Sequence, residues 1–144
     1  MSSAENTLAA LRAINQRAAF NQWCGIEVVK AEPGLVEIHM PWRNEVGQYA
    51  GFLHAGLVGA LIDTACGFAA VTQAGQYGVL ASHFSVNCLR PAVGEQFMAR
   101  AKVIKAGKTQ FFTACELFAL SEGTEKLVAT GETILSVVAA QATT

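Results

Sequence analysis

The sequence predicts an α+β domain in which an antiparallel, curved sheet wraps around one long buried central helix. Two observations carry this prediction. Residues 55–73 are rich in Ala and Leu and apolar nearly all round, which is typical of a helix buried on every side. After Gly78, four long segments with strand character follow one another through short turns, which favours antiparallel neighbours. A sheet curled around this helix would bury it without a second layer.

Before the central helix, the sequence predicts one helix, a strand pair and a loop. Residues 3–20 place apolar side chains at helical spacing on one face, and "WCG" ends this helix. The stretch "IEVVKAEPGLVEIHMP" predicts two short strands around a turn at Pro33 and Gly34. Residues 41–53, rich in Asn, Gln and Gly, predict a loop.

The second half of the chain predicts the larger part of the sheet. The connectors "RPAVGE", "AGKT" and "SEGTEK" are short, so each is expected to join neighbouring strands. Glycines within the central helix indicate a close approach of neighbouring backbone there. The four strands are expected at residues 79–90, 95–106, 109–120 and 126–138.

Length and composition define the class of protein. A chain of 144 residues fits a single domain over residues 1–144. Hydrophobic residues make up 52% and charged residues 15%, against roughly 25% charged in an average soluble domain. This surplus of apolar surface predicts an oligomer. A net charge of −1, without any run of Lys or Arg, argues against nucleic-acid binding.

Targeting and redox signals are weak. The N-terminal segment lacks the pattern of a signal peptide, and the longest apolar run, 55–71, is interrupted by Asp63 and short for a membrane span. The four cysteines are widely spaced without a CxxC pair, which argues against zinc. We expect free thiols in a cytoplasmic protein that needs no membrane, metal or cofactor.

Asp63 is the clearest candidate functional residue. Between residues 46 and 89 it is the one member of the set Asp, Glu, Lys and Arg. The alternative interpretation is a surface residue on a partly exposed helix or a structural carboxylate bonded to a neighbour, as most Asp residues in proteins are. A buried carboxylate without a nearby cation, however, is costly and has a raised pKa, and groups of this kind cluster at functional sites.

Two polar residues precede the helix that carries Asp63. His54 lies immediately before the helix start, where unpaired backbone N–H groups can bind a developing oxyanion. Gln48, in the polar loop, could orient a carbonyl group or a water molecule. Cys66 lacks a cationic neighbour that would activate it, so we interpret it as a small core residue. His39 and His83 lie in alternating strands and are interpreted as structural or pocket-lining residues.

The segment "GFLHAGLVGALIDTACGFAA" resembles the HGG-containing segment of hotdog-fold acyl-CoA thioesterases of the PaaI type, in the 4-hydroxybenzoyl-CoA thioesterase-like superfamily. "SVNCLRPAVGE" and "AKVIKAGKT" resemble the third and fourth strands of that family. The resemblance covers roughly residues 20–138. It implies a hotdog fold and cofactor-free hydrolysis of an acyl-CoA thioester by a homodimer, assembled into a dimer of dimers (a tetramer).

The resemblance also implies roles for particular residues. Asp63 corresponds to the general base or nucleophile, and the backbone N–H of Ala55 to the group that polarises the thioester carbonyl. Gln48 and His54 correspond to residues that position the carbonyl or water. Ala55 stands where the family has Gly directly after the His. The substrate-binding candidates are Gly56, Phe52, Phe84, Ser82 and Lys108, of which Ser82 follows an Ala at a position where the family often has Ser or Thr.

Two other functions remain open from the sequence: a non-catalytic acyl-CoA-binding or sensing protein, and a hydroxyacyl-thioester dehydratase. Fold alone does not separate them. Geometry adds one expectation. Asp63 lies eight residues after Ala55, or about 12 Å along a helix, so one helix cannot bring both to the same reacting group. We therefore expect each active site to be shared between two subunits.

Overall fold

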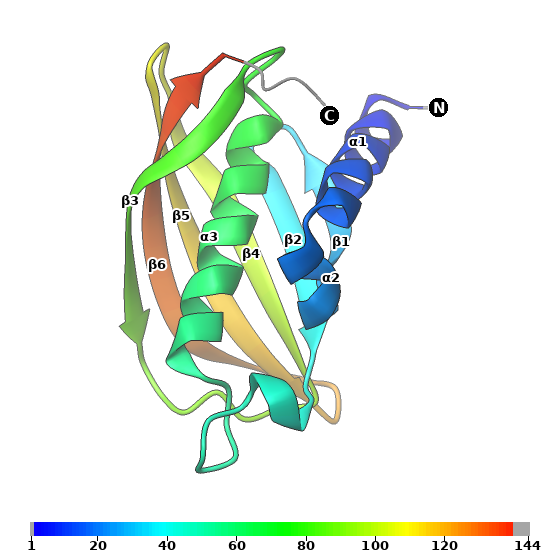
Figure 1. Cartoon of the computed structure of the whole chain (residues 1–144), viewed down its shortest axis with the longest axis vertical. Helices are drawn as coiled ribbons and strands as arrows, with labels where there is room; N and C mark the ends of the chain where they lie inside the picture. Colours follow the sequence, from blue (N-terminus) through cyan, green and yellow to red (C-terminus); the bar gives the residue numbers. More distant parts are fainter. Residues whose placement is uncertain (1, 140–144) are drawn as a thin grey trace.

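The computed structural model describes residues 2–139 and confirms the predicted architecture, a curved antiparallel sheet around one long helix (Figure 1). Its six strands follow the order β1-β2-β4-β5-β6-β3. This is the α+β arrangement expected of a hotdog fold. The elements are α1 (Ser3–Arg17), α2 (Ala19–Cys24), β1 (Glu27–Glu32), β2 (Leu35–Pro41), η1 (Asn44–Val46), α3 (Ala55–Val71), β3 (Gly78–Cys88), β4 (Gln96–Ala106), β5 (Gln110–Ser121) and β6 (Thr124–Val138).

The N-terminal region departs from the predicted single helix. Ala18 has an extended backbone with ψ of 108° and separates α1 from α2. The buried amide of Asn15 donates to the Ile26 carbonyl at 2.8 Å and accepts from Asn21 at 3.0 Å. These polar contacts tie α2 back onto α1, which a straight helix would not allow. The end of the helical region at "WCG" is confirmed, since Gly25 is left-handed with φ of 77°.

The central helix α3 is confirmed, although it ends at Val71 rather than at residue 73. It lies across the inner face of the sheet (Figure 1), and the side chains of Leu61, Ile62 and Ala65 are fully buried there. The expected close approach of neighbouring backbone at the helix glycines is not found: a Cβ atom would meet side chains instead, Phe84 Cε2 at 3.4 Å from Gly59 and Leu135 Cδ2 at 3.8 Å from Gly67. In the described part of the chain, no helix is both long and apolar enough to span a membrane.

The predicted pairing of β3 with β4 is wrong, whereas the β1–β2, β4–β5 and β5–β6 hairpins are confirmed. β3 pairs with β6 and lies at the edge of the sheet. In Figure 1 the connector after β3 passes below the lower end of α3 instead of turning back. In this connector, the Ala92 carbonyl accepts from the Leu53 N–H at 3.0 Å and the Glu95 carbonyl accepts from the Trp42 N–H at 2.8 Å. These contacts replace those of a hairpin.

Candidate functional site

The N-terminus of α3 is held in place by its capping residue, His54. The ring Nδ1 of His54 accepts a hydrogen bond from the Gly56 N–H at 2.8 Å, and the His54 N–H donates to the Val46 carbonyl at 3.1 Å. Because Nδ1 is an acceptor, the proton of the neutral ring lies on Nε2, which can donate outward. The predicted position of His54 just before the helix is confirmed.

The loop that carries Gln48 folds back towards this terminus. The Gln48 N–H donates to the Phe52 carbonyl at 2.8 Å, and Gly47 pairs with Leu53 in an isolated antiparallel bridge. The side-chain Oε1 of Gln48 accepts from the Ala50 N–H. Its Nε2 group is therefore the end of the side chain that can donate to another molecule.

A pocket of about 410 Å³ brings together four of the predicted site residues. Within the described residues, the N–H of Ala55 has no hydrogen-bond acceptor, as expected for the first residue of a helix. The pocket therefore offers a backbone donor and the side-chain donors of Gln48, His54 and Arg90 beside mostly apolar walls. It is lined by Gln48, Phe52, Leu53, His54, Ala55, Val58, Cys88, Arg90, Pro91, Ala92 and Val128.

Asp63 does not line this pocket. It lies two turns further along α3 and is half-buried, and burial raises the pKa of its carboxyl group. Gly59, four residues earlier, shares its helix face. A Cβ atom at Gly59 would lie 3.4 Å from Cε2 of Phe84 on β3, so this face of the helix points towards the β3 edge of the sheet.

The remaining substrate-binding candidates are dispersed. The N–H of Gly56 is occupied by the His54 ring, and Phe84 is 48% exposed beside Gly59. The Ser82 hydroxyl donates to the Ile134 carbonyl at 3.1 Å at an irregularity in the β3–β6 ladder. Lys108 lines a separate pocket of about 590 Å³ with Tyr77, beyond the C-terminal end of α3. One chain therefore does not collect all predicted residues at one place.

Among the described residues, the Cys and His side chains considered from the sequence do not form a second functional site. Cys66 is fully buried beside Cys115, and the hydrogen bond between these thiols, with burial, raises the pKa of Cys115. The described residues contain no group of three His, Cys, Asp or Glu side chains placed to hold a metal ion.

Arg90 is the charged pocket residue that sequence reasoning did not single out. It is the one cation in the lining of the pocket that contains His54 and Ala55. Its signal in the sequence is its position, since it is the first charged residue after Asp63. Arg90 reaches the N-terminus of α3 because the connector between β3 and β4 crosses to another part of the sheet. The sequence pattern did not reveal this crossing.

Comparison with known proteins links this site to a family. The thioesterase superfamily matches residues 50–126, a range that contains His54, Ala55, Asp63 and Arg90. Human acyl-coenzyme A thioesterase 13 is 33% identical over 124 residues, which cover 84% of this chain and 86% of that protein. A thioesterase family protein from Silicibacter pomeroyi is 35% identical, with a TM-score of 0.86 over 90% of this chain and 96% of that chain.

The E. coli PaaI protein, from the phenylacetic acid degradation operon, has the same fold at 21% identity. Its TM-score is 0.86, and the match covers 99% of this chain and 100% of that chain. The relatives above 30% identity and the superfamily match include α3, which His54 caps and which carries Asp63. This chain therefore belongs to the thioesterase superfamily and is a hydrolase of thioesters.

Proposed function

We propose that this thioester hydrolase acts on acyl-CoA at a site formed by two subunits of a homodimer. The pocket at the N-terminus of α3 binds the thioester, and Asp63 of the partner subunit supplies the general base. The acyl-CoA substrate is inferred from the human relative, which is named an acyl-coenzyme A thioesterase. The observation that carries the proposal is the separation of Asp63 from the pocket that contains Gln48, His54 and Ala55.

A two-fold dimer can bring Ala55 and Asp63 together, although they are separated along α3 of one chain. Ala55, Gly59 and Asp63 follow one another at four-residue intervals, so they form one stripe on the helix. Gly59 lies midway between the other two and faces β3 through Phe84. If a two-fold axis passes at the level of Gly59, then Ala55 of one chain lies at the level of Asp63 of the partner subunit. Each dimer then contains two complete sites.

The edge strand β3 offers the surface for this pairing. Its 11 residues contain no Asp, Glu, Lys or Arg, and most of them are exposed. A long uncharged edge strand is a template for pairing with another strand. Antiparallel pairing of β3 with its copy would place the two α3 helices antiparallel on the same side of a continuous sheet.

The chemistry then follows from the groups at the site. The thioester carbonyl oxygen accepts from the Ala55 N–H at the positive end of α3, which stabilises the charge that develops on this oxygen. The Gln48 Nε2 and His54 Nε2 groups hold the carbonyl or the attacking water. The partner's Asp63 removes a proton from water, which attacks the carbonyl carbon. The C–S bond breaks, and the thiol leaves with that proton.

Mixing two inactive variants tests the shared site. Asp63→Ala and His54→Ala proteins are unfolded and refolded together at equal amounts, and release of free thiol from acyl-CoA is followed. With random pairing about half of the dimers are hybrids, each with one intact site of two, so activity should recover to about a quarter of wild type. Each variant refolded alone is the control. If hybrids form but the mixture stays inactive, the base and the pocket belong to one chain.

The same assay separates the proposal from the two other functions left open by the sequence. A binding or sensing protein would retain acyl-CoA without releasing thiol. A dehydratase would convert a hydroxyacyl-CoA to its unsaturated product and leave the thioester intact. Thiol release that depends on Asp63 therefore supports hydrolysis against both.

A further inference from the structure

The segment that leads to the pocket is fastened to helix α2 by Arg43. Residues 42–54, here named the pocket loop, connect β2 to α3 and carry Gln48 and His54. The Nη2 group of Arg43 donates to the Trp23 carbonyl, and the Cζ atom of its guanidinium lies 4.2 Å from the centre of the Trp23 ring. The last turn of a helix leaves carbonyl groups without partners, so Arg43 also caps the C-terminal end of α2. One side chain thus joins α2 to the pocket loop.

The α2 side of this contact is itself held in place. The Trp23 ring stacks on Phe20, with the ring centres 6.5 Å apart. Gly25 ends α2 with a left-handed backbone, and a Cβ atom there would lie 3.2 Å from Cδ of Pro41 at the end of β2. The polar contacts described above tie α2 to α1. Helix α2 is therefore a fixed support for the pocket loop.

On the other side of the contact, a series of hydrogen bonds leads from Arg43 to the start of α3. The Arg43 carbonyl accepts from the Val46 N–H at 3.2 Å, and the Val46 carbonyl accepts from the His54 N–H at 3.1 Å. The ring Nδ1 of His54 in turn accepts from the Gly56 N–H at 2.8 Å. Gln48 follows Val46 by two residues. A displacement of Arg43 would therefore be passed on to both pocket side chains of this loop, Gln48 and His54.

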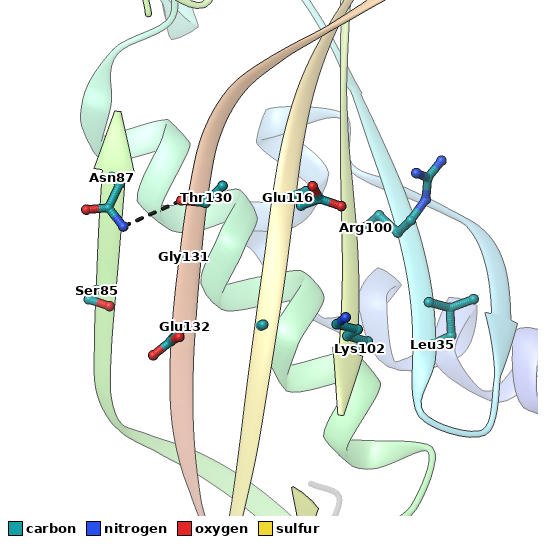
Figure 2. Close-up of a pocket in the computed structure, with 10 residues that line it drawn as sticks. Leu35, Ser85, Asn87, Arg100, Lys102, Glu116, Thr130, Gly131 and Glu132 are labelled. Atoms are coloured by element: carbon teal, nitrogen blue, oxygen red, sulfur yellow. Dashed lines mark hydrogen bonds between the residues drawn. The ribbon is translucent and has the colours of Figure 1, made fainter. Parts of the chain in front are cut away.

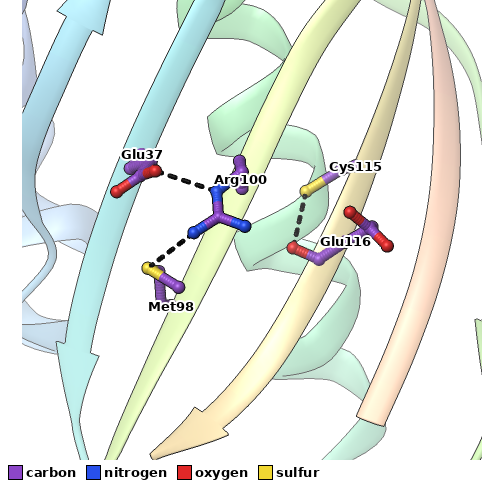
Figure 3. A network of polar contacts seen from close by, with 5 residues as sticks. All are labelled: Glu37, Met98, Arg100, Cys115 and Glu116. Carbon is purple, nitrogen blue, oxygen red and sulfur yellow. Dashed lines mark hydrogen bonds and ion pairs between the residues drawn. The ribbon is translucent and has the colours of Figure 1, made fainter. Parts of the chain in front are cut away.

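Arg43 differs from Arg100 in its surroundings. Arg100 lines a shallow groove on the face of the sheet opposite α3 (Figure 2), and its Nε donates to Glu37 Oε1 at 2.8 Å (Figure 3). This is the single ion pair within 4.0 Å among the residues that the structure describes, so Arg43 has no carboxylate partner there. Its Nε group is buried and has no hydrogen-bond acceptor among these residues. A buried donor without an acceptor costs free energy, so a contribution to stability does not by itself explain Arg43.

We propose that Arg43 is a positioning residue for thioester hydrolysis, because it holds the pocket loop on α2 and thereby fixes Gln48 and His54 in the pocket. This role rests on the proposed function, in which the pocket binds the thioester. Arginine suits the role because its planar guanidinium can stack on an aromatic ring and donate to a carbonyl group at the same time. Without Arg43 the Nε2 donors of Gln48 and His54 remain, but their distances to the carbonyl or water vary. Small misplacements of such groups reduce the rate strongly.

The kinetics of Arg43→Ala test this role, with release of free thiol from acyl-CoA as the assay. The value of kcat should fall by about 10- to 100-fold, with a smaller change in KM, because the misplaced groups act on the reacting carbonyl rather than on the rest of the substrate. Arg12→Ala is the matched control. Arg12 Nε donates to the Val28 carbonyl at 3.0 Å and likewise fastens a helix to a neighbouring segment, but outside the pocket loop. Its kcat should stay near that of the wild type.

Combined variants separate positioning from a general loss of structure. In a chain that already carries Gln48→Ala and His54→Ala, the further change Arg43→Ala should alter kcat by less than about twofold, because the groups that Arg43 positions are gone. A general weakening of the fold would lower kcat by the same factor with or without these two side chains. Trp23→Ala removes the stacking ring and leaves the carbonyl, so its loss of kcat should be smaller than that of Arg43→Ala. The two changes together should cost no more than Arg43→Ala alone.

An Arg43→Ala protein with the kcat of the wild type would overturn the proposal, as would an equal loss in the chain that lacks Gln48 and His54. If Arg43→Ala does not fold, Arg43→Gln keeps the packing of the side-chain stem, and the same kinetic comparison applies to it. The proposed function of the pocket fails in a different way. In that case Gln48→Ala and His54→Ala would each keep the kcat of the wild type, and the role of Arg43 would fall with that of the pocket.

Discussion

β1 and β3 are the two edges of the same sheet, and they differ in how they are protected. β1 has 6 residues, among them Glu27, Lys30 and Glu32, and α1 packs against it. β3 has 11 residues, none of them charged, and its exposed side chains include Leu80 and Phe84. Charges, short length and a covering helix are the usual means by which proteins prevent edge pairing. β1 uses all three, and β3 uses none of them.

The two sides of α3 also differ from each other. The stripe of α3 that carries Gly59 and Asp63 faces β3, and Asp63 remains half-buried there in a single chain. The opposite side of α3 packs against the sheet with fully buried side chains such as Leu61. The unprotected edge and the candidate carboxylate Asp63 thus lie on the same side of the molecule. A second subunit at β3 would complete both the sheet and the site.

The largest effect is expected when β3 is given the protection that β1 has. Leu80→Lys places a charge on the open edge at a side chain that is 53% exposed, so the single chain should still fold. Gel filtration with light scattering should show loss of the β3-paired dimer. Thiol release should fall to about the level of Asp63→Asn, because the isolated chain lacks the base that we propose the partner subunit supplies.

The matched control is Glu32→Lys on β1, which changes an exposed side chain at the protected edge. It should leave both the mass and the activity near those of the wild type. A Leu80→Lys protein that keeps its mass would show that β3 is not the dimer edge. One that becomes monomeric and keeps its activity would show that a single chain contains a complete site.

Next in size is the effect of Asp63→Asn, which removes the carboxylate at nearly constant volume. Hydrolysis should drop by roughly 10²–10⁴-fold if this carboxylate acts as general base. In the wild type, activity should rise with pH along an acid limb whose midpoint lies above the usual Asp range, since burial raises the pKa of Asp63. Steady-state rates against pH check this, and near-wild-type turnover of the variant would contradict the role.

Stability should change in the opposite direction to activity. A raised pKa means that the folded state holds this proton more tightly, so the contribution of Asp63 to stability is present at acid pH and is lost as pH rises through the raised pKa. Asp63→Asn should therefore have a higher melting temperature than the wild type at neutral pH. The difference should shrink as the pH falls towards about 4, the ordinary Asp value.

Most of this fold could be predicted from local pattern. The buried helix over 55–71 and the hairpins within 96–138 follow from apolar periodicity and turn residues, which act over short distances. The position of β3 could not be predicted in this way. A seven-residue connector, 89–95, can close a hairpin or cross to another strand, and the choice depended on long-range backbone contacts with Trp42 and Leu53.

The candidate site shows the same limit. Gln48, His54 and Ala55 are close in the chain, and they line one pocket. Arg90 reaches that pocket from a distant segment, so spacing could not reveal it. Asp63 was recognised by its isolation among apolar residues, whereas its distance from the pocket follows from simple helix geometry.

A smaller effect is expected at His54, where capping and catalysis can be separated. His54→Ala removes the cap on Gly56 and should cost about 0.5–2 kcal/mol of stability, together with activity. His54→Asn keeps a side-chain oxygen that can cap the helix but lacks the Nε2 donor. We expect Asn to restore the melting temperature and to leave kcat low. Full recovery of kcat by Asn would show that His54 acts through the cap alone.

The smallest effect is expected for Ala55→Gly, at the start of the stripe that faces the open edge. The backbone N–H, which we propose polarises the carbonyl, remains, and only the methyl group beside the pocket is lost. The cost in stability should be small because the substitution lies at the helix terminus rather than in its interior. The ratio of the activity on a bulky aryl-CoA to the activity on a short-chain acyl-CoA should stay the same or rise by a few fold at most. The ratio of kcat/KM for the two substrates measures this, with the melting temperature as control.

If kcat falls strongly at an unchanged melting temperature, the methyl group positions the thioester instead of crowding it, and the pocket wall at Ala55 is part of the catalytic geometry.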